Sequence, residues 1–238
     1  MINGINSREM ILEILLEIEE GEHSHVAIRN ALSKYQFLPK QDRAFITRVC
    51  EGTLEYRIQI DYIINSFSKV TVDKMKPAIR EILRSAVYQL KYMDSVPDSA
   101  VCNEAVKLAQ RKGFYNLKPF VNGVLRTIAR EMDQVRFPQK EDDLLKYLSV
   151  KYSMPEVLVT RWLEAYGEET TEKILADFLT EHPLTIRCRT YLNSKEEVIK
   201  SLESQGVHVA PAPYLPYAYS ISEFNHILAL DAFVKGKI

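Results

Sequence analysis

Apolar side chains recur three and four residues apart through the first 135 residues, as on the buried face of an amphipathic helix. Glycine and proline interrupt this pattern at positions typical of helix ends and starts, namely Gly21, Pro39, Pro77, Pro97 and Pro119. The pattern predicts a compact all-α bundle of about six helices. The expected helices cover residues 7–20, 26–34, 41–66, 77–92, 97–112 and 119–132.

The pattern changes twice in the second half of the chain. Phe137-Pro138-Gln139-Lys140, followed by acidic residues, predicts a boundary, and Gly167 predicts a helix end within the segment that follows. After Pro183 the apolar period becomes two, as in a half-buried strand. The expected elements are helices at 144–151, 155–166 and 170–181, a strand at 184–191, a helix to 204, and strands at 207–209 and 217–222.

These patterns predict a mainly α fold in three parts. Residues 1–137 form the helical bundle, residues 138–182 form a helical connector, and residues 183–238 begin a small α+β subdomain. Because three short strands and one helix make a thin sheet, we expect the chain to be part of a longer protein.

Composition adds a charge asymmetry. The chain is 46% apolar and 26% charged, which excludes a disordered or fibrous protein. Residues 1–140 contain 21 Lys and Arg against 17 Asp and Glu, whereas residues 141–238 contain 10 against 15. The basic first half favours an anionic partner there. The chain has no uncharged apolar run of eighteen residues, which a membrane-spanning helix would need, and no secretory signal is visible. We therefore expect a cytoplasmic protein without membrane segments.

The sequence offers no catalytic constellation. The eight glycines are scattered, without a phosphate-binding or dinucleotide loop. Cys50, Cys102 and Cys188 lie far apart and form no C-x-x-C motif, and His23 and His25 lack a third ligand nearby. We therefore expect no catalytic, cofactor-binding or metal-binding residue in this chain.

Two predicted helices carry a basic stripe beside the apolar face. Arginine suits phosphate oxygens through its planar fork of donors. The predicted RNA-binding residues are Arg80, Arg84 and Lys91 on one helix, Asn122, Arg126 and Arg130 on another, and Arg43, Arg48 and Arg187 elsewhere. The alternative is that some of these arginines form internal ion pairs, for example with Glu81, Glu104 or Asp94.

Several segments of the first half resemble the NusB family, the all-helical RNA-binding proteins of bacterial transcription antitermination. The resemblance covers about residues 5–135 and is carried by residues 42–46, 51–54, 60–63, 77–90 and 120–126.

The second half resembles a different family. Tyr152-Ser153-x-Pro155, Arg161-Trp162, Tyr166-Gly167-Glu168 and residues 183–187 are similar to the start of the methyltransferase region of the RsmB family, also called Sun or Fmu. These are cytosine carbon-5 methyltransferases of small-subunit ribosomal RNA. The family implies a NusB-like domain, then a small RNA-recognition-like subdomain and a catalytic domain. The chain departs from the family after Arg187, where Cys188 to Leu192 replace the common Val-Asn-x-Leu-Lys.

The family's chemistry, as the resemblance implies, uses cysteines in Pro-Cys and Thr-Cys contexts and the methyl group of S-adenosylmethionine. Here the three cysteines follow Val49, Val101 and Arg187, so none matches. We therefore expect a C-terminally truncated enzyme whose catalytic domain is missing. This fragment would be inactive alone and bind no S-adenosylmethionine, which only the full-length protein would use.

The expected partner is 16S ribosomal RNA. A protein partner that binds the helical domain is a further possibility. Charge reversal at Arg84 and Arg126 should weaken RNA binding without unfolding the bundle. Two alternatives remain: a non-enzymatic, NusB-like antitermination or regulatory factor, and a helical protein–protein adaptor.

Overall fold

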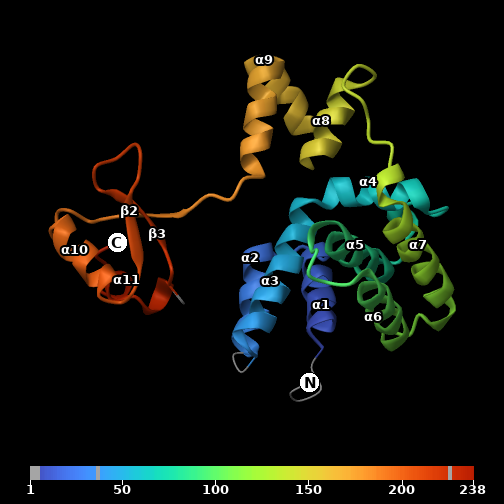
Figure 1. The fold of residues 1–238 in the computed structure, drawn as a ribbon, viewed down its shortest axis with the longest axis horizontal. Coiled ribbons are helices and arrows are strands. Elements are labelled where there is room, and N and C mark those ends of the chain that lie inside the picture. Colours follow the sequence, from blue (N-terminus) through green and yellow to red (C-terminus); the bar gives the residue numbers. More distant parts are fainter. Residues whose placement is uncertain (1–5, 36–37, 225–226) are drawn as a thin grey trace. The chain divides into compact units, whose positions relative to one another are not determined.

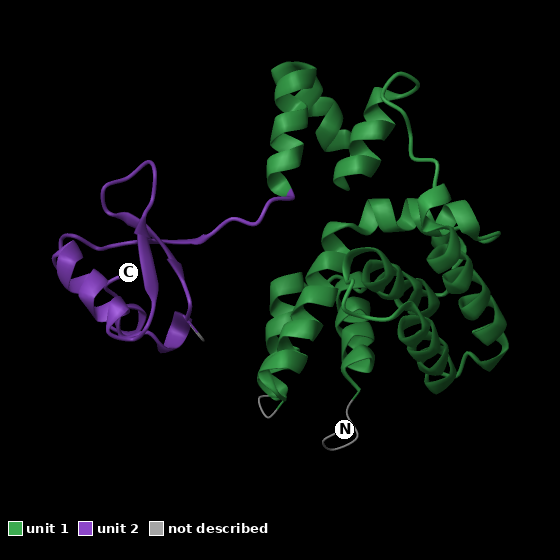
Figure 2. Cartoon of the chain, in the orientation of Figure 1, with its two compact units in different colours: residues 1–178 green, residues 179–238 purple. Residues whose placement is uncertain are grey.

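The computed structural model describes residues 6–35, 38–224 and 227–238. The chain forms two compact units, Met1–Phe178 and Leu179–Ile238 (Figure 2). The first unit contains only helices among its described residues, and the second contains a small sheet (Figure 1).

Seven α-helices form the bundle within residues 6–35 and 38–134, and α5 packs against five of the others. They are α1 (Ser7–Glu19), α2 (Ser24–Lys34), α3 (Lys40–Glu55), α4 (Arg57–Phe67), α5 (Pro77–Tyr92), α6 (Asp98–Arg111) and α7 (Lys118–Glu131). Short 3₁₀ turns lie at Val72–Lys74, Tyr115–Leu117 and Met132–Gln134. Pro77 occupies the first turn of α5 and Gly113 follows α6 with φ +85°, as the sequence predicts.

The expected helix at 41–66 is wrong in one respect, because the structure divides it into α3 and α4. Tyr56 interrupts the helix with φ −94° and ψ 17°. Its ring stacks on Tyr92 at a centroid distance of 4.3 Å, and the Tyr88 ring packs against Gly52. The break therefore depends on aromatic packing against α5, which the helical period of this segment does not reveal.

Two further helices complete the first unit: α8 (Leu144–Tyr152) and α9 (Glu156–Phe178). Their small core contains Leu148, Val159 and Leu175. Gly167 interrupts α9 with φ 75° and ψ 172°, a backbone conformation open essentially only to glycine, so the predicted helix end at this glycine is confirmed.

The second unit contains an antiparallel sheet in the order β1-β3-β2. Its elements are β1 (Leu184–Arg187), α10 (Lys195–Glu203), β2 (His208–Pro211), β3 (Ala218–Ser222), a 3₁₀ turn (Ile227–Ala229) and α11 (Asp231–Val234). Ile186, Tyr219 and Ile221 share one sheet face and belong to a core with Val198 and Leu202 of α10.

The first strand is shorter than the expected 184–191. Cys188 still pairs with the β2–β3 loop, but the N–H of Arg189 donates to the carbonyl of Lys237 at 2.9 Å. The N–H of Leu192 then donates to the carbonyl of Arg189 and closes a turn. Competing backbone partners therefore end the strand, although the alternation of apolar and polar side chains continues to Cys188.

Candidate nucleic-acid interface

The outer face of α7 carries three of the predicted RNA-binding side chains. The opposite face is buried in the bundle core and fixes this orientation through Val121, Val124, Leu125 and Ile128. Arg126 is exposed, and its Nε donates to Oδ1 of Asn122 at 2.9 Å. This bond uses one of the five N–H donors of the guanidinium, so the others can bind an anion.

Arg130 lies one helical turn further along α7, and its side chain is 70% exposed. Its Nη2 lies 2.6 Å from Oε1 of the neighbouring Glu131. A solvated pair of this kind contributes about 0–1 kcal/mol, so a phosphate can replace the carboxylate at little cost. Together Arg126 and Arg130 present two accessible cations on α7.

On α3, Arg43 is half-buried and Arg48 is exposed. Arg48 lies close enough to the phenol of Tyr88 to affect its ionisation. Burial raises the pKa of Tyr88, and the positive charge of Arg48 opposes that increase. Arg48 therefore places a cation on the surface beside Tyr88 of α5.

Arg84 on α5 is engaged inside the bundle, which is the internal ion pairing that the sequence left open. Its side chain is 11% exposed. Nε and Nη2 donate to the two carboxylate oxygens of Asp61 at 2.7 and 2.6 Å, and Nη1 donates to Glu81 at 2.5 Å. Burial alone would lower the pKa of Arg84, but the bonds to Asp61 and Glu81 raise it above its ordinary value.

Arg80 and Lys91, the other members of the α5 stripe, are also engaged. Arg80 pairs with Glu19 of α1, and its Nη1 donates to the carbonyl of Val72 at 3.2 Å. The Nζ atom of Lys91 lies 5.4 Å from the ring centroid of Phe137, and burial lowers the pKa of this lysine. The structure thus separates the two predicted stripes: α7 presents its cations outward, while α5 uses them to join elements.

A hollow of about 240 Å³ lies beside the α5 arginines. Arg57, Arg80 and Arg84 line it, together with Glu19 and Glu81. Burial raises the pKa of Glu81 despite the opposing charge of Arg84. Because carboxylates oppose the arginines here, the hollow is a charge-balanced network and a poor site for an anion.

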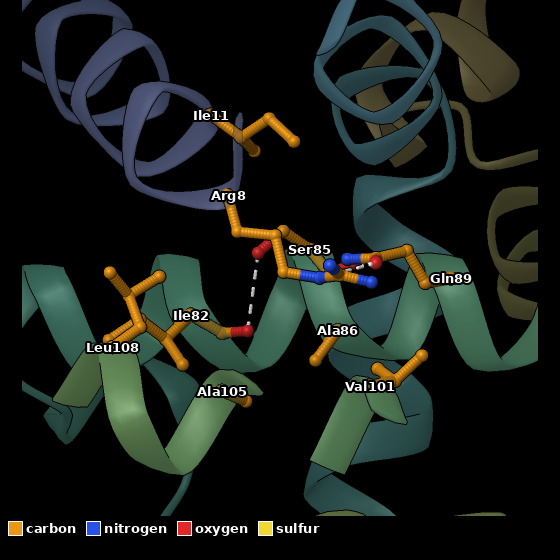
Figure 3. A pocket seen from close by; sticks show the side chains of 9 residues that line it. All are labelled: Arg8, Ile11, Ile82, Ser85, Ala86, Gln89, Val101, Ala105 and Leu108. Atoms are coloured by element: carbon orange, nitrogen blue, oxygen red, sulfur yellow. Dashed lines mark hydrogen bonds between the residues drawn. The ribbon is translucent and has the colours of Figure 1, made fainter. Parts of the chain in front are cut away.

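A second polar contact inside the bundle involves Arg8, which is not among the RNA-binding residues predicted from the sequence. Arg8 of α1 donates from Nε to Oε1 of Gln89 at 3.1 Å, and Figure 3 shows these side chains meeting beside Ser85. Their hollow has a volume of about 10 Å³, which suits about one water molecule. Arg8 also lies 5.3 Å from the ring centroid of Phe45 and has a pKa lowered by burial. This contact joins α1 to α5 and presents no binding surface.

Arg187, the one candidate in the second unit, is exposed at the end of β1. It pairs in register with Ala218 of β3, on the sheet face opposite Ile186 and its core. The structure therefore places accessible candidates on both units, with Arg187 as the candidate on the second.

The described residues carry no activated nucleophile among the cysteines. Cys50, Cys102 and Cys188 are buried, and burial raises the pKa of each thiol. A thiol rather than a thiolate is a poor nucleophile, so these cysteines suit packing. Within residues 6–35, 38–224 and 227–238, no three His, Cys, Asp or Glu side chains gather as metal ligands. No described helix has the length and apolar character needed to cross a membrane.

Two parts of the chain match known families. Residues 5–130 match the NusB family, and residues 154–227 match the ferredoxin-like domain of RsmF/B-like methyltransferases.

The chain is similar to curated proteins of two kinds. It is 32% identical over 202 residues to a probable ribosomal RNA small subunit methyltransferase B of Bacillus subtilis, covering 85% of this chain and 44% of the relative. A protein of the same name from Synechocystis is 29% identical over 98% of this chain and 52% of its own length. The transcription antitermination protein NusB of Bacillus velezensis is 33% identical over 53% of this chain and 95% of its own length. The chain spans about half the length of the two methyltransferase relatives.

The fold also resembles a solved structure. The crystal structure of PH0851 matches with a TM-score of 0.69 at 23% identity, over 98% of this chain and 52% of that one. At this level of identity the likeness concerns the fold, and it includes both units.

Proposed function

The chain belongs to the NusB family through residues 5–130, and we propose that it is the RNA-binding N-terminal part of a 16S ribosomal RNA (cytosine-C5) methyltransferase. The observation that carries this proposal is the order of the two matched domains. A NusB domain followed by an RsmF/B ferredoxin-like domain occurs together in this chain, and relatives named methyltransferase B align across both. The enzyme would depend on S-adenosylmethionine and work in the cytoplasm.

In this proposal the three parts have different tasks. Residues 1–137 grip ribosomal RNA, residues 138–182 connect, and residues 183–238 begin the methyltransferase region. The grip uses the exposed cations Arg48, Arg126 and Arg130, with Asn122 and Arg43 beside them and Arg187 on the second unit. Arg80, Arg84 and Lys91 leave the RNA-binding set, because their contacts lie within the first unit. Phosphate contacts of this kind position an enzyme on RNA without reading its sequence.

S-adenosylmethionine would be bound elsewhere in this proposal. We assign its site, and methyl transfer, to the part of the longer relatives that this chain does not cover.

The RNA grip is tested by charge reversal on α7. We expect Arg126→Glu with Arg130→Glu to weaken binding of the chain to transcribed 16S ribosomal RNA while its helical circular dichroism spectrum stays the same. If about six phosphates are contacted, log K falls with log salt at a slope near −4, and each lost contact reduces the slope by about 0.7. The matched control is Lys173→Glu on α9, whose side chain is 73% exposed. Equal weakening by the control would remove α7 from the proposed grip.

The enzymatic part of the proposal is tested in cells. Deletion of the gene should remove a 5-methylcytosine from 16S ribosomal RNA, as measured by bisulfite sequencing, and re-expression of the full-length protein should restore it. Unchanged methylation, together with reduced read-through of ribosomal RNA operons, would favour the non-enzymatic antitermination factor. That alternative is supported by the similarity to NusB proteins over the first half of the chain.

A further inference from the structure

Two tyrosines of the second unit are almost fully exposed. Tyr191 is 77% exposed in the loop that follows β1, and Tyr214 is 91% exposed in the loop between β2 and β3. An exposed aromatic ring contributes little hydrophobic stabilisation to the fold. It gains that stabilisation only when a partner covers it.

The sheet topology brings both loops to one end. β1 ends at Arg187, which pairs in register with Ala218, the first residue of β3. The N–H of Cys188 then donates to the carbonyl of Tyr217 at 2.9 Å, so a backbone hydrogen bond joins the two loops. Tyr191 and Tyr214 each lie three residues from this bond.

Both loops are held in shape by their own backbone. In the first loop the N–H of Leu192 donates to Arg189, and in the second the N–H of Ala218 donates to Leu215, each at 3.0 Å. Pro211, Pro213 and Pro216 further restrict the second loop. A restricted loop loses little entropy when its tyrosine binds, so the geometry favours a preorganised contact.

The charges at this end are positive. Arg187 and Arg189 are both exposed, and no structural ion pair engages either side chain among the described residues. Neither 187–195 nor 211–222 contains an acidic residue, and the nearest acids in sequence are Glu196 at the start of α10 and Glu223 after the far end of β3. Exposed aromatic rings beside unpaired arginines are typical of surfaces that bind single-stranded nucleic acid.

The open face of the sheet is a poorer stacking surface than its end. Thr185, Ser220 and Ala210 lie in one register row on that face, and all three side chains are small. His208 at the start of β2 carries the one ring among the strand residues of that face, whereas the two most exposed tyrosines of this unit lie in the loops.

We propose that Arg187, Arg189, Tyr191 and Tyr214, the loop-end site, bind unpaired nucleotides of RNA. Each tyrosine stacks on one base, and the arginines contact the neighbouring phosphates. This inference rests on the proposed function and deepens it, since it gives the second unit a preference for unpaired RNA that the phosphate grip on α7 lacks.

The test measures the affinity of the whole chain for a fluorescein-labelled, unstructured 12-nucleotide RNA and for a hairpin of the same composition. We expect Tyr191→Ala and Tyr214→Ala each to weaken binding of the unstructured RNA about 5-fold or more, and the phenylalanine variants to bind within about 2-fold of the unsubstituted chain. Tyr115→Ala is the matched control, because Tyr115 is 59% exposed on the other unit. Binding of the hairpin should change little.

The salt dependence separates stacking from charge. The tyrosine variants should leave the slope of log K against log salt unchanged, whereas Arg187→Gln should reduce it by about 0.7. Photo-crosslinking of 5-bromouridine RNA, followed by mass spectrometry, should identify Tyr191 and Tyr214.

Each result has a distinct meaning. Unchanged affinity of the double variant, Tyr191→Ala with Tyr214→Ala, overturns the loop-end site and assigns the tyrosines to a protein surface. The proposed grip still stands in that case if reversal of Arg126 and Arg130 weakens binding. If the tyrosine variants weaken binding and the α7 reversal does not, the grip on α7 fails and the loop-end site stands. No binding of either RNA at low salt overturns both.

Discussion

At the residue scale, the positive charge of Arg84 compensates two carboxylates inside the bundle. It bonds to both carboxylate oxygens of Asp61 on α4 and to Glu81 on its own helix. The Glu81 side chain is 4% exposed, so its carboxylate depends on this cation for compensation. The function of Arg84 is therefore to stabilise the bundle.

We predict that Arg84→Met lowers the free energy of unfolding by about 3 kcal/mol, because it leaves Glu81 and Asp61 without their partner. Urea unfolding followed by circular dichroism measures this change. Arg126→Met, at an exposed position on α7, is the control and should change stability by less than about 0.5 kcal/mol. Equal stability of the two variants would contradict the assigned role of Arg84. The sequence-based expectation that reversal of Arg84 spares the fold is revised accordingly.

Glu172 on α9 gives a prediction about pH. Hydrogen bonds from Lys151, then Tyr152 and Lys140, hold the pKa of this carboxyl at about 2, well below its ordinary value of 4.5. The folded state therefore gains stability above about pH 4.5, and loses it as the pH falls toward 2 and the carboxylate is protonated. Glu172→Gln should lower stability at pH 7 by about 1 kcal/mol and flatten this acid-dependent loss.

Trp162, the only tryptophan of the chain, reports this change directly. It lies on α9 and stacks on Phe178 at a centroid distance of 5.7 Å. Its fluorescence should follow thermal unfolding of the connector between pH 6 and pH 2. An acid limb that is identical in the variant and the unsubstituted chain would show that Glu172 contributes nothing to it.

Only some of these residue roles could be predicted from the sequence. Glu81 lies three positions before Arg84 on one helix, so that ion pair can be anticipated from spacing. Asp61 and Glu19 are distant in sequence, and only the packing of α4 and α1 on α5 brings them near. The exposure of Tyr191 and Tyr214 could not be predicted from the sequence, because a tyrosine in a loop belongs to no periodic pattern of buried and exposed positions.

At the element scale, two helical glycines differ in what surrounds them. A Cβ at Gly52 of α3 would overlap the ring of Tyr88, which is 4% exposed and lies near Tyr56 and Tyr92. A Cβ at Gly123 of α7 would meet no atom of the described structure within 4 Å. Gly52 therefore serves helix packing, and Gly123 only adds backbone freedom.

We predict opposite effects of the same substitution at these positions. Gly52→Ala should lower the free energy of unfolding by about 1–3 kcal/mol, because the buried tyrosine ring must move. Gly123→Ala should raise it by about 0.5–1 kcal/mol, since alanine restricts the unfolded chain and favours the helix. Chemical unfolding of both variants measures this difference. A gain in stability at Gly52 would show that the α3–α5 contact is loosely packed.

Helix limits marked by proline or glycine were predictable, whereas limits set by tertiary contacts were not. Pro77 and Gly113 bound their helices as expected, and Gly167 interrupts α9. Tyr56 separates α3 from α4 although tyrosine is no helix breaker by itself.

At the scale of the whole molecule, each unit has a hydrophobic core of its own. Leu125 is fully buried in the bundle, and Ile221 is 3% exposed in the core of the sheet unit. The fold class and the order of helices before sheet followed from the sequence, because the apolar period itself changes at Pro183. The separate cores predict separate effects of core substitutions.

Leu125→Ala and Ile221→Ala should each destabilise mainly the unit that contains the change, by about 2–5 kcal/mol. Hydrogen exchange with mass spectrometry resolves this, because peptides from each unit report local opening. Leu125→Ala should accelerate exchange in the bundle, and Ile221→Ala in the sheet. A uniform acceleration along the chain in both variants would show that the units unfold as one.

The order of strands in the sheet has a consequence for biosynthesis. β3 is the central strand and the last of the three to be made, so β1 has no neighbour until the ribosome has added residue 222. At about 5–20 residues per second, this wait lasts roughly 2–7 seconds after β1 has been made. The bundle core, complete by α7, needs no such delay. Translation speed through residues 188–222 therefore sets how long a nascent, unpaired strand is exposed to chaperones.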